Sequence, residues 1–310
     1  MSTGTGEPRF TITRLDVSFL SGPDRCRAWL YLPDDTTTPP PVVVLGHGLG
    51  GTREMRLDAF AERFAAAGIA ALAFTYRHFG DSEGSPRQLL SIGRQLQDWE
   101  AAIRFVRGRD DVDGTRTGLW GSSFGGGHAL TIGARHPELA AVIAQCPFTD
   151  GLASARAASP IETARVVGPV VRDLIAMVAR RPPVTIPIAS KPGSVGLMSA
   201  PDALPGYVEI SPPGMNFENS AAARAIPSIV RYRPGRSIRS IASPVFVCVS
   251  NTDSVTPAGP TLRYATTARH AQVKRYEAGH FDFYTGPVFE ELATDQVAFL
   301  VRHLAPEVRR

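Results

Sequence analysis

The pentapeptide at residues 121–125 constrains the fold of this chain more than any other segment. It reads Gly-Ser-Ser-Phe-Gly and directly follows the short apolar run 117–120. A Gly-x-Ser-x-Gly pattern in this setting predicts a strand that turns sharply into a helix, because the glycines relieve crowding and leave Ser123 exposed at the turn. A serine hydroxyl held in this way can attack a carbonyl carbon when a histidine and an acid lie beside it.

Apolar, strand-like runs alternate with amphipathic, helix-like segments on both sides of this turn. The expected strands are 41–45, 69–74, 117–120, 141–145, 244–249 and 273–276, and the expected helices are 54–67, 88–107, 125–136 and 288–304. This alternation indicates an α/β fold with a mostly parallel central sheet and helices on both faces. Segments 10–19 and 27–32 alternate polar and apolar residues, which predicts an antiparallel hairpin at the sheet edge.

The alternation of strands and helices is interrupted in the middle of the chain. Residues 159–162 read Ser-Pro-Ile-Glu, which is typical of a helix start, and an apolar helix is expected to follow. Residues 182–214 are rich in proline and glycine without a clear period, as in functional lids and flexible linkers. We therefore expect residues 1–150 and 241–310 to form one core, with residues 151–240 inserted as a helical and irregular cap.

Two segments near the C-terminus supply the partners that a nucleophilic serine needs. His280 follows the last expected strand in a glycine turn, and histidine titrates in the range of a general base. Asp253 follows the preceding strand, where a carboxylate would orient the imidazole and stabilise its charged form. Because parallel strands end at one edge of the sheet, we expect Ser123, Asp253 and His280 to meet there. Asp150 and Asp282 are the alternatives for the acid.

Acyl chemistry also needs hydrogen-bond donors for the carbonyl oxygen that gains negative charge. We expect the backbone N–H groups of Phe124, directly after the serine, and of Leu49, in the glycine-rich loop 46–52, to supply them. Glycines let this backbone approach a substrate closely. His47 is expected to support the loop, and phosphate binding is disfavoured because no lysine follows as in a P-loop.

The candidates for the substrate pocket are aromatic, methionine and histidine side chains near the expected site. They are His78, Phe148, Met177, Met198, Met215, Phe217, Tyr232 and Phe281. For the cap residues, ordinary packing within the cap is an equally good interpretation. His78 lies in segment 76–84, in which Asp81 and Ser82 are expected to support a shaped loop.

Composition and charge narrow the function further. The chain has 310 residues, of which 43% are hydrophobic and 20% charged, as in an ordinary globular protein. The net charge of +4 is spread along the chain, so no nucleic-acid partner is expected. The polar first residues do not resemble a secretory signal, and no apolar run reaches membrane-spanning length, so no membrane partner is expected. Three cysteines without a Cys-x-x-Cys motif favour a cytoplasmic location.

Taken together, these motifs resemble the α/β-hydrolase superfamily. Four segments carry the resemblance to the dienelactone-hydrolase and acetyl-xylan-esterase-like group, and to fungal polyketide acyl transferases: 46–52, 76–84, 121–126 and 279–282. The resemblance implies an α/β-hydrolase fold and serine-dependent acyl chemistry with no metal and no organic cofactor. Dehalogenases and epoxide hydrolases of this superfamily carry aspartate where this chain has Ser123.

The resulting hypothesis is an esterase or thioesterase that cleaves a small-to-medium apolar acyl substrate through an acyl-enzyme. Acyl transfer to an alcohol or amine, as in polyketide metabolism, is the alternative because it uses the same residues. A ligand receptor is less favoured, since a receptor needs no paired nucleophile and base. A peptidase is also less favoured, because the chain lacks the large extra domain of many serine peptidases of this fold. The expected partners are a small-molecule ester or thioester and a second copy in a homodimer.

Overall fold

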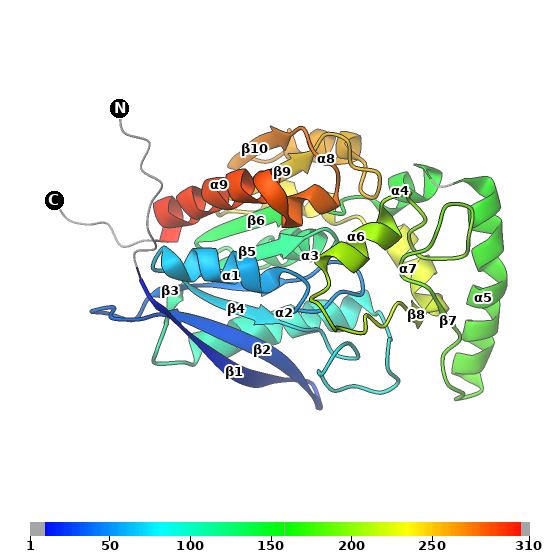
Figure 1. The fold of residues 1–310 in the computed structure, drawn as a ribbon, viewed down its shortest axis with the longest axis horizontal. Helices are drawn as coiled ribbons and strands as arrows, with labels where there is room; N and C mark the ends of the chain where they lie inside the picture. The colour runs from blue at the N-terminus through cyan, green and yellow to red at the C-terminus, as the bar shows by residue number, and fades with distance from the viewer. Residues whose placement is uncertain (1–9, 158, 305–310) are drawn as a thin grey trace.

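Across residues 10–157 and 159–304, which the computed structural model describes, the chain builds an eight-stranded, mostly parallel sheet (Figure 1). In spatial order the strands are β1 (Ile12–Ser21), β2 (Asp24–Pro33), β4 (Ala70–Phe74), β3 (Pro41–Gly46), β5 (Asp113–Ser122), β6 (Ala141–Gln145), β9 (Val245–Ser250) and β10 (Ala271–Tyr276). The β1–β2 hairpin is antiparallel and β2 pairs antiparallel with β4, while the remaining neighbours are parallel. The expected parallel sheet and edge hairpin are confirmed.

Helices cover both faces of this sheet (Figure 1). They are α1 (Leu57–Ala66), α2 (Ile92–Arg107), α3 (Phe124–Gly133), α8 (Ala258–Ala265) and α9 (Gly286–Leu304). Helices α1 and α9 pack together on one face, and α2 packs beside α3 on the other. Strands β3, β4, β6 and β9 are buried along their whole length, as continuous apolar runs predict.

Helix α2 begins four residues later than the sequence pattern predicts. The backbone of Gln88 has a φ of 57°, in the left-handed region, and its N–H donates to the His78 carbonyl at 2.9 Å. Gln88 therefore belongs to the preceding loop, and the helix starts after Ser91. From there on, Leu96, Trp99 and other apolar residues form the buried face that the helical spacing predicts.

Residues 151–240, which we call the insert, lie between β6 and β9 on one side of the sheet (Figure 1). The insert contains α4 (Gly151–Ala157), α5 (Pro160–Val178), β7 (Thr185–Ile186), α6 (Ala203–Ile210), β8 (Ala221–Ala222), α7 (Ile226–Arg231) and two short 3₁₀ turns among its described residues. Strands β7 and β8 pair with each other in a small separate sheet. Helix α6 falls in the stretch for which the sequence predicts no element, because Pro205 and Gly206 are poor helix formers.

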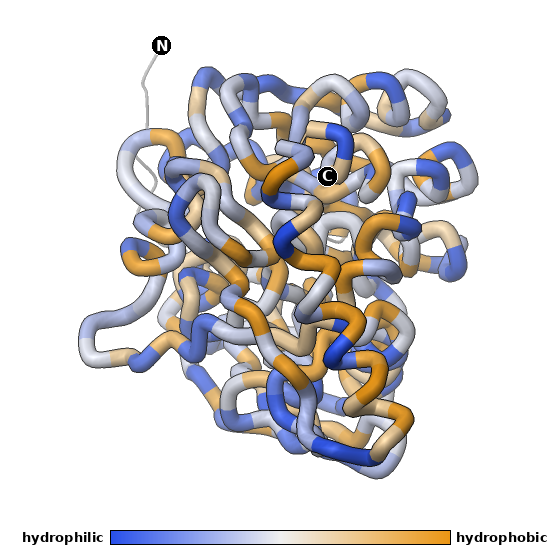
Figure 2. Tube along the Cα trace, turned by 90° about the vertical axis from the view of Figure 1, so that its right-hand side faces the viewer, coloured by the Kyte–Doolittle hydropathy of each residue, from blue (hydrophilic) through white to orange (hydrophobic). Residues whose placement is uncertain are grey.

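Helix α5 starts where the sequence predicts it to start. The Ser159 hydroxyl accepts a hydrogen bond from the Glu162 N–H at 3.1 Å, and the Glu162 carboxylate accepts from the Ser159 N–H at 3.3 Å. The helix lies at the outer edge of the molecule, and seven of its apolar side chains are exposed: Ile161, Val167, Val171, Leu174, Ile175, Met177 and Val178. Figure 2, which views this side, shows hydrophobic stretches of the chain in orange.

Within the described residues, no helix combines the length and hydrophobicity that a membrane crossing requires. Cys26, Cys146 and Cys248 are all buried and unbridged. Burial raises the pKa of the Cys26 and Cys248 thiols, so these two side chains are protonated and act as small core residues.

Candidate active site

Ser123 lies at the junction of β5 and α3, in a backbone conformation that side chains rarely adopt. Its φ of 55° and ψ of −118° cost about 1–3 kcal/mol, which the surrounding structure must offset. A Cβ on Gly121 would lie 2.1 Å from the Gly125 carbonyl oxygen, and a Cβ on Gly125 would lie 2.4 Å from that of His47. Both positions therefore require glycine, and together they explain the Gly-x-Ser-x-Gly pattern.

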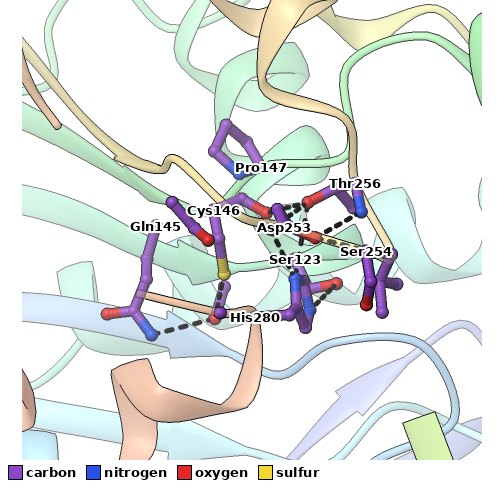
Figure 3. Close-up of polar contacts among 12 residues, drawn as sticks. Ser123, Gln145, Cys146, Pro147, Asp253, Ser254, Thr256 and His280 are labelled. Atoms are coloured by element: carbon purple, nitrogen blue, oxygen red, sulfur yellow. Dashed lines mark hydrogen bonds and ion pairs between the residues drawn. The ribbon is translucent and has the colours of Figure 1, made fainter. Parts of the chain in front are cut away.

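The structure brings the three expected catalytic side chains together (Figure 3). His280 Nε2 lies 3.1 Å from Ser123 Oγ, and His280 Nδ1 lies 2.8 Å from Asp253 Oδ2. The N–H on Nδ1 donates to the carboxylate, which leaves Nε2 free to accept the serine proton. The other carboxylate oxygen of Asp253 accepts the N–H groups of Val255 at 2.8 Å and Thr256 at 2.6 Å.

The two alternative acids lie elsewhere. Asp150 accepts a hydrogen bond from the Tyr264 hydroxyl at 2.7 Å and caps the N–H of Ala153 at 3.0 Å. Asp282 accepts the N–H of Gly279 at 2.7 Å in its own loop. Among the described residues, Asp253 is therefore the acid in hydrogen-bond contact with the His280 ring.

Burial and charge act in opposite directions on the His280–Asp253 pair. His280 is only 3% exposed, and this burial lowers its pKa. The negative charge of Asp253 raises the pKa, and the net pKa lies well above the ordinary value. Burial also raises the pKa of Asp253, and the His280 charge reverses that effect, so its net pKa is lowered. Asp253 thus stays ionised, and His280 holds a proton more tightly than a free imidazole.

A thiol and a hydroxyl that the sequence motifs do not indicate also lie at this site (Figure 3). Cys146 Sγ, a carboxylate oxygen of Asp253 and a ring nitrogen of His280 all lie within 4.8 Å of one another. Thr256 Oγ1 lies 2.8 Å from Asp253 Oδ2 and 3.1 Å from the Cys146 carbonyl oxygen. Because Asp253 and His280 already bond to each other, the set is better suited to holding a proton than to ligating a metal.

The glycine-rich loop 46–52 passes directly over the serine. A Cβ on Gly48 would lie 3.2 Å from Ser123 Cβ, so the Gly48 backbone lies against the nucleophile. The N–H groups of Leu49 and Phe124 donate no hydrogen bond to any residue that the structure describes. Both residues line the same cavity as Ser123, so their N–H groups remain the candidates for binding an oxyanion.

The His47 side chain connects this loop to the segment that follows β4. The Tyr76 N–H donates to His47 Nε2 at 3.4 Å, which places the ring proton on Nδ1, 2.9 Å from the Gly48 carbonyl oxygen. Burial lowers the pKa of His47 to about 4, so the ring is neutral near pH 7. A neutral, fully engaged imidazole holds the loop and has no free nitrogen for proton transfer.

A cavity of about 320 Å³ opens beside Ser123, between the core and the insert. This volume lies in the roughly 300–1,000 Å³ range of ligand pockets. Most of its lining is apolar and includes Phe148, Val166, Met198, Ile226, Ile229 and Val255. Leu49 and Phe124 line the same cavity as Ser123.

Phe148 and Met198 lie at the cavity, as expected, but the other pocket candidates do not line it. These are His78, Met177, Met215, Phe217, Tyr232 and Phe281. The ring of His78 is engaged by the Pro86 carbonyl at 2.9 Å and by Arg94 at 3.0 Å, which removes it from the cavity. Met177 points outward from α5 and is exposed.

The remaining four candidates serve as packing. Phe217 stacks on Tyr207 with ring centroids 5.0 Å apart, and Phe281 contacts the same tyrosine at 5.5 Å. Tyr232 lies beneath the Phe124 ring, and its hydroxyl bonds to a histidine of α3 at 2.9 Å. Met215 packs partly buried against the hydrophobic core. Composition alone cannot distinguish such residues from those that line a cavity.

The chain also matches a known protein family and several known proteins. Residues 37–192 match the family described as "Serine aminopeptidase, S33". The chain is 50% identical over 288 residues to the quorum-quenching protein AidA of Acinetobacter baumannii (strain MDR-ZJ06), covering 93% of this chain and 94% of that protein. It is 25% identical over 311 residues to the thiohydrolase aneE of Aspergillus aculeatus, covering 94% of each.

A solved structure supports the same fold. The α/β hydrolase GrgF from Penicillium sp. sh18 superposes with a TM-score of 0.77 at 22% sequence identity, covering 96% of this chain and 100% of that one. A polyketide transferase grgF of Penicillium is 24% identical over 303 residues, covering 95% of this chain and 98% of the relative. With the sheet order described above, this likeness confirms the expected α/β-hydrolase fold.

Proposed function

Because this chain belongs to the α/β-hydrolase superfamily, in the family described as "Serine aminopeptidase, S33", we propose that it is a serine-dependent esterase or thioesterase. The substrate is a carboxylic ester or thioester with a small-to-medium apolar acyl group. One observation carries the proposal: Ser123 Oγ lies 3.1 Å from His280 Nε2 at the edge of an apolar cavity. Asp253, bonded to His280 at 2.8 Å, completes the proposed triad.

In the first step, Ser123 Oγ forms a bond to the acyl carbon and its proton passes to His280 Nε2. The carbonyl oxygen becomes negatively charged and accepts hydrogen bonds from the N–H groups of Leu49 and Phe124. Asp253 stabilises the imidazolium that forms. The bond between the acyl carbon and the leaving oxygen or sulfur then breaks, and His280 gives its proton to the departing alcohol or thiol.

The acyl-enzyme is hydrolysed by the reverse of this sequence. His280 takes a proton from water as the water oxygen bonds to the acyl carbon. The bond from the carbon to Ser123 Oγ breaks, the proton returns to the serine, and the carboxylic acid leaves. All atoms and protons in these steps are accounted for without a metal or an organic cofactor.

The lining of the cavity supports an apolar acyl substrate, and the names of two relatives support the kind of substrate that is cleaved. Met198, Ile226 and Ile229 offer aliphatic surface to an acyl chain. The thiohydrolase name of one relative supports thioesters. The quorum-quenching name of the relative that is 50% identical over 288 residues supports a bacterial signal molecule as the substrate. We also propose that the insert acts as a cap, since α4, α5 and α7 all contribute to the cavity wall.

Acyl transfer is the second candidate function, and the polyketide-transferase relative favours it. The acyl-enzyme is the same, but an alcohol or amine replaces water as the acceptor. The two functions differ in whether the site excludes water and binds the acceptor.

A substrate panel tests the proposal. The purified chain is assayed with p-nitrophenyl esters and acyl thioesters of graded chain length and with acylated lactones, each with and without added alcohols. We expect kcat/KM to rise with chain length and then fall when the chain exceeds the cavity, with the free acid as product. An ester product that forms in place of the acid would assign the transferase function. No turnover of any acyl substrate, together with no labelling of Ser123 by a fluorophosphonate, would reject both functions.

A further inference from the structure

The glycine-rich loop that carries Leu49 has little internal structure to hold it. Gly48, Gly50 and Gly51 surround Leu49, and Gly50 has a φ of +62°. The turn bond from the Gly51 N–H to the Gly48 carbonyl oxygen is 3.4 Å, which is long for a hydrogen bond. Because glycine has many accessible conformations, contacts from outside the loop are also needed to keep the backbone of Leu49 in one conformation.

Two of the outside contacts come from the insert. Inside the loop, the His47 ring holds the Gly48 carbonyl, which belongs to the same peptide as the Leu49 N–H. From the insert, the Tyr207 hydroxyl of α6 holds the next peptide by donating a hydrogen bond to the Leu49 carbonyl oxygen. Ile188, which follows β7, covers Gly50 so closely that a Cβ there would lie 2.3 Å from its Cδ1. Tyr207 and Ile188 are both buried, so these contacts form in a dry environment, where a lost hydrogen bond is not replaced by water.

Helix α6 also contacts the loops that carry the other two proposed catalytic groups. A Cβ on Gly206 would lie 2.1 Å from the Phe281 ring, so the helix backbone packs directly beside the residue after His280. Asp202, at the start of α6, accepts a hydrogen bond from the hydroxyl of Ser254, the residue after Asp253. A single short helix therefore touches the oxyanion, base and acid loops.

We infer that Tyr207 is a positioning residue for the reaction: by holding the Leu49 carbonyl, it keeps the Leu49 backbone in the conformation in which the Leu49 N–H points at the developing oxyanion. The inference rests on the proposed function. The tyrosine touches no reacting atom and acts through the Leu49 carbonyl. Its hydrogen bond should therefore contribute to binding the transition state, in which the oxygen is charged, and little to binding the substrate.

Replacing Tyr207 with phenylalanine tests this role, because the ring that stacks on Phe217 is kept and only the hydroxyl is lost. We expect kcat per active site on a p-nitrophenyl ester to fall about 10-fold, less than the ~10²–10³-fold typical for loss of a whole oxyanion donor. KM should stay within about 2-fold. The inhibition constant of an alkyl trifluoromethyl ketone, which forms a charged hemiketal with the serine, should rise by the same factor as kcat falls.

Tyr264→Phe is the matched control. This substitution removes a tyrosine hydroxyl whose hydrogen bond, to Asp150, lies outside the proposed machinery, and it should leave kcat, KM and the ketone affinity unchanged. The concentration of active sites is titrated with a fluorophosphonate, so misfolded protein is not counted when kcat is calculated. If Tyr207→Phe is poorly folded, Ile188→Val tests the same loop and should shift kcat and ketone affinity in the same direction.

The possible outcomes separate this inference from the proposed function. A wild-type chain that neither hydrolyses esters nor reacts with the fluorophosphonate rejects the function itself. An active wild type with a Tyr207→Phe variant of unchanged kcat and unchanged ketone affinity overturns only the role of Tyr207. A variant that raises KM and the ketone inhibition constant equally, with kcat unchanged, would show general packing instead and would also overturn it.

Discussion

At the scale of single residues, the site depends on a serine held in a strained backbone conformation. Gly121 and Gly125 make that conformation possible because no Cβ fits at either position. Their spacing, and the order of Ser123, Asp253 and His280 along the chain, are visible in the sequence, so the side chains at the site can be predicted before the fold is known. The choice of Asp253 over Asp150 depends on which carboxylate reaches the imidazole, and only the geometry decides that.

The raised pKa of His280 predicts the pH dependence of the activity. The imidazole must be neutral to accept the serine proton, and the Asp253 charge keeps it protonated to a higher pH than usual. The acidic limb of the kcat/KM profile should therefore lie above the ordinary histidine value of about 6.5, with activity falling as the pH is lowered. A pH profile with a p-nitrophenyl ester measures this limb.

Asp253→Asn should move the same limb in the opposite direction. Without the carboxylate charge, burial dominates and the pKa of His280 falls, so the limb moves to lower pH. Turnover should fall about 10³–10⁴-fold, because the imidazole loses its orientation and its counter-charge. Asp150→Asn should leave both the limb and the turnover near wild type. The reverse ranking of the two variants would assign the acid role to Asp150.

At the scale of helices and strands, the core follows the sequence pattern and the insert does not. The apolar face of α2 and the capping box of α5 are local signals and can be read directly. Helix α6 has no such signal, because it carries proline and glycine and is stabilised by contacts with distant residues such as Phe281. Cavity-lining residues such as Val166 are equally unpredictable, since adjacent residues of a helix point about 100° apart and nothing local in the sequence tells which of them meets a cavity.

Two adjacent valines of α5 test the assigned cavity. Val166 lines the cavity, whereas Val167 is 55% exposed on the outer face. Val166→Trp should fill part of the acyl site, lowering kcat/KM at least about 10-fold for the longest accepted ester and little for acetate. Val167→Trp should leave the chain-length profile unchanged. Equal profiles for both variants would place the acyl chain elsewhere.

At the scale of the whole molecule, the sheet order and the helix layers follow from the alternation of strands and helices, because parallel strands require crossover helices. How the insert sits on the core does not follow from this rule. The exposed face of α5 is a further property that appears only in the assembled structure. Val167, Val171, Leu174 and Val178 are spaced four, three and four residues apart, which is typical of a helix that packs against another helix.

We expect this face of α5 to form the interface of a homodimer. A Cβ on Gly168 would have no described atom within 4 Å, so the chain itself gives no packing reason for a glycine that costs about 1 kcal/mol in mid-helix. Light scattering should show a wild-type dimer and a folded Val171→Asp monomer. A monomeric wild type, or a dimer that survives the substitution, would contradict this expectation.

Mass spectrometry of the acyl-enzyme tests the central claim most directly. The wild-type chain is quenched during turnover of a p-nitrophenyl ester, and the intact mass and the modified peptide are determined beside Ser123→Ala. The account predicts one acyl group on the peptide that contains Ser123, and neither adduct nor turnover in a Ser123→Ala variant whose melting temperature is close to wild type. An adduct on another residue, or turnover that persists in Ser123→Ala, would contradict it.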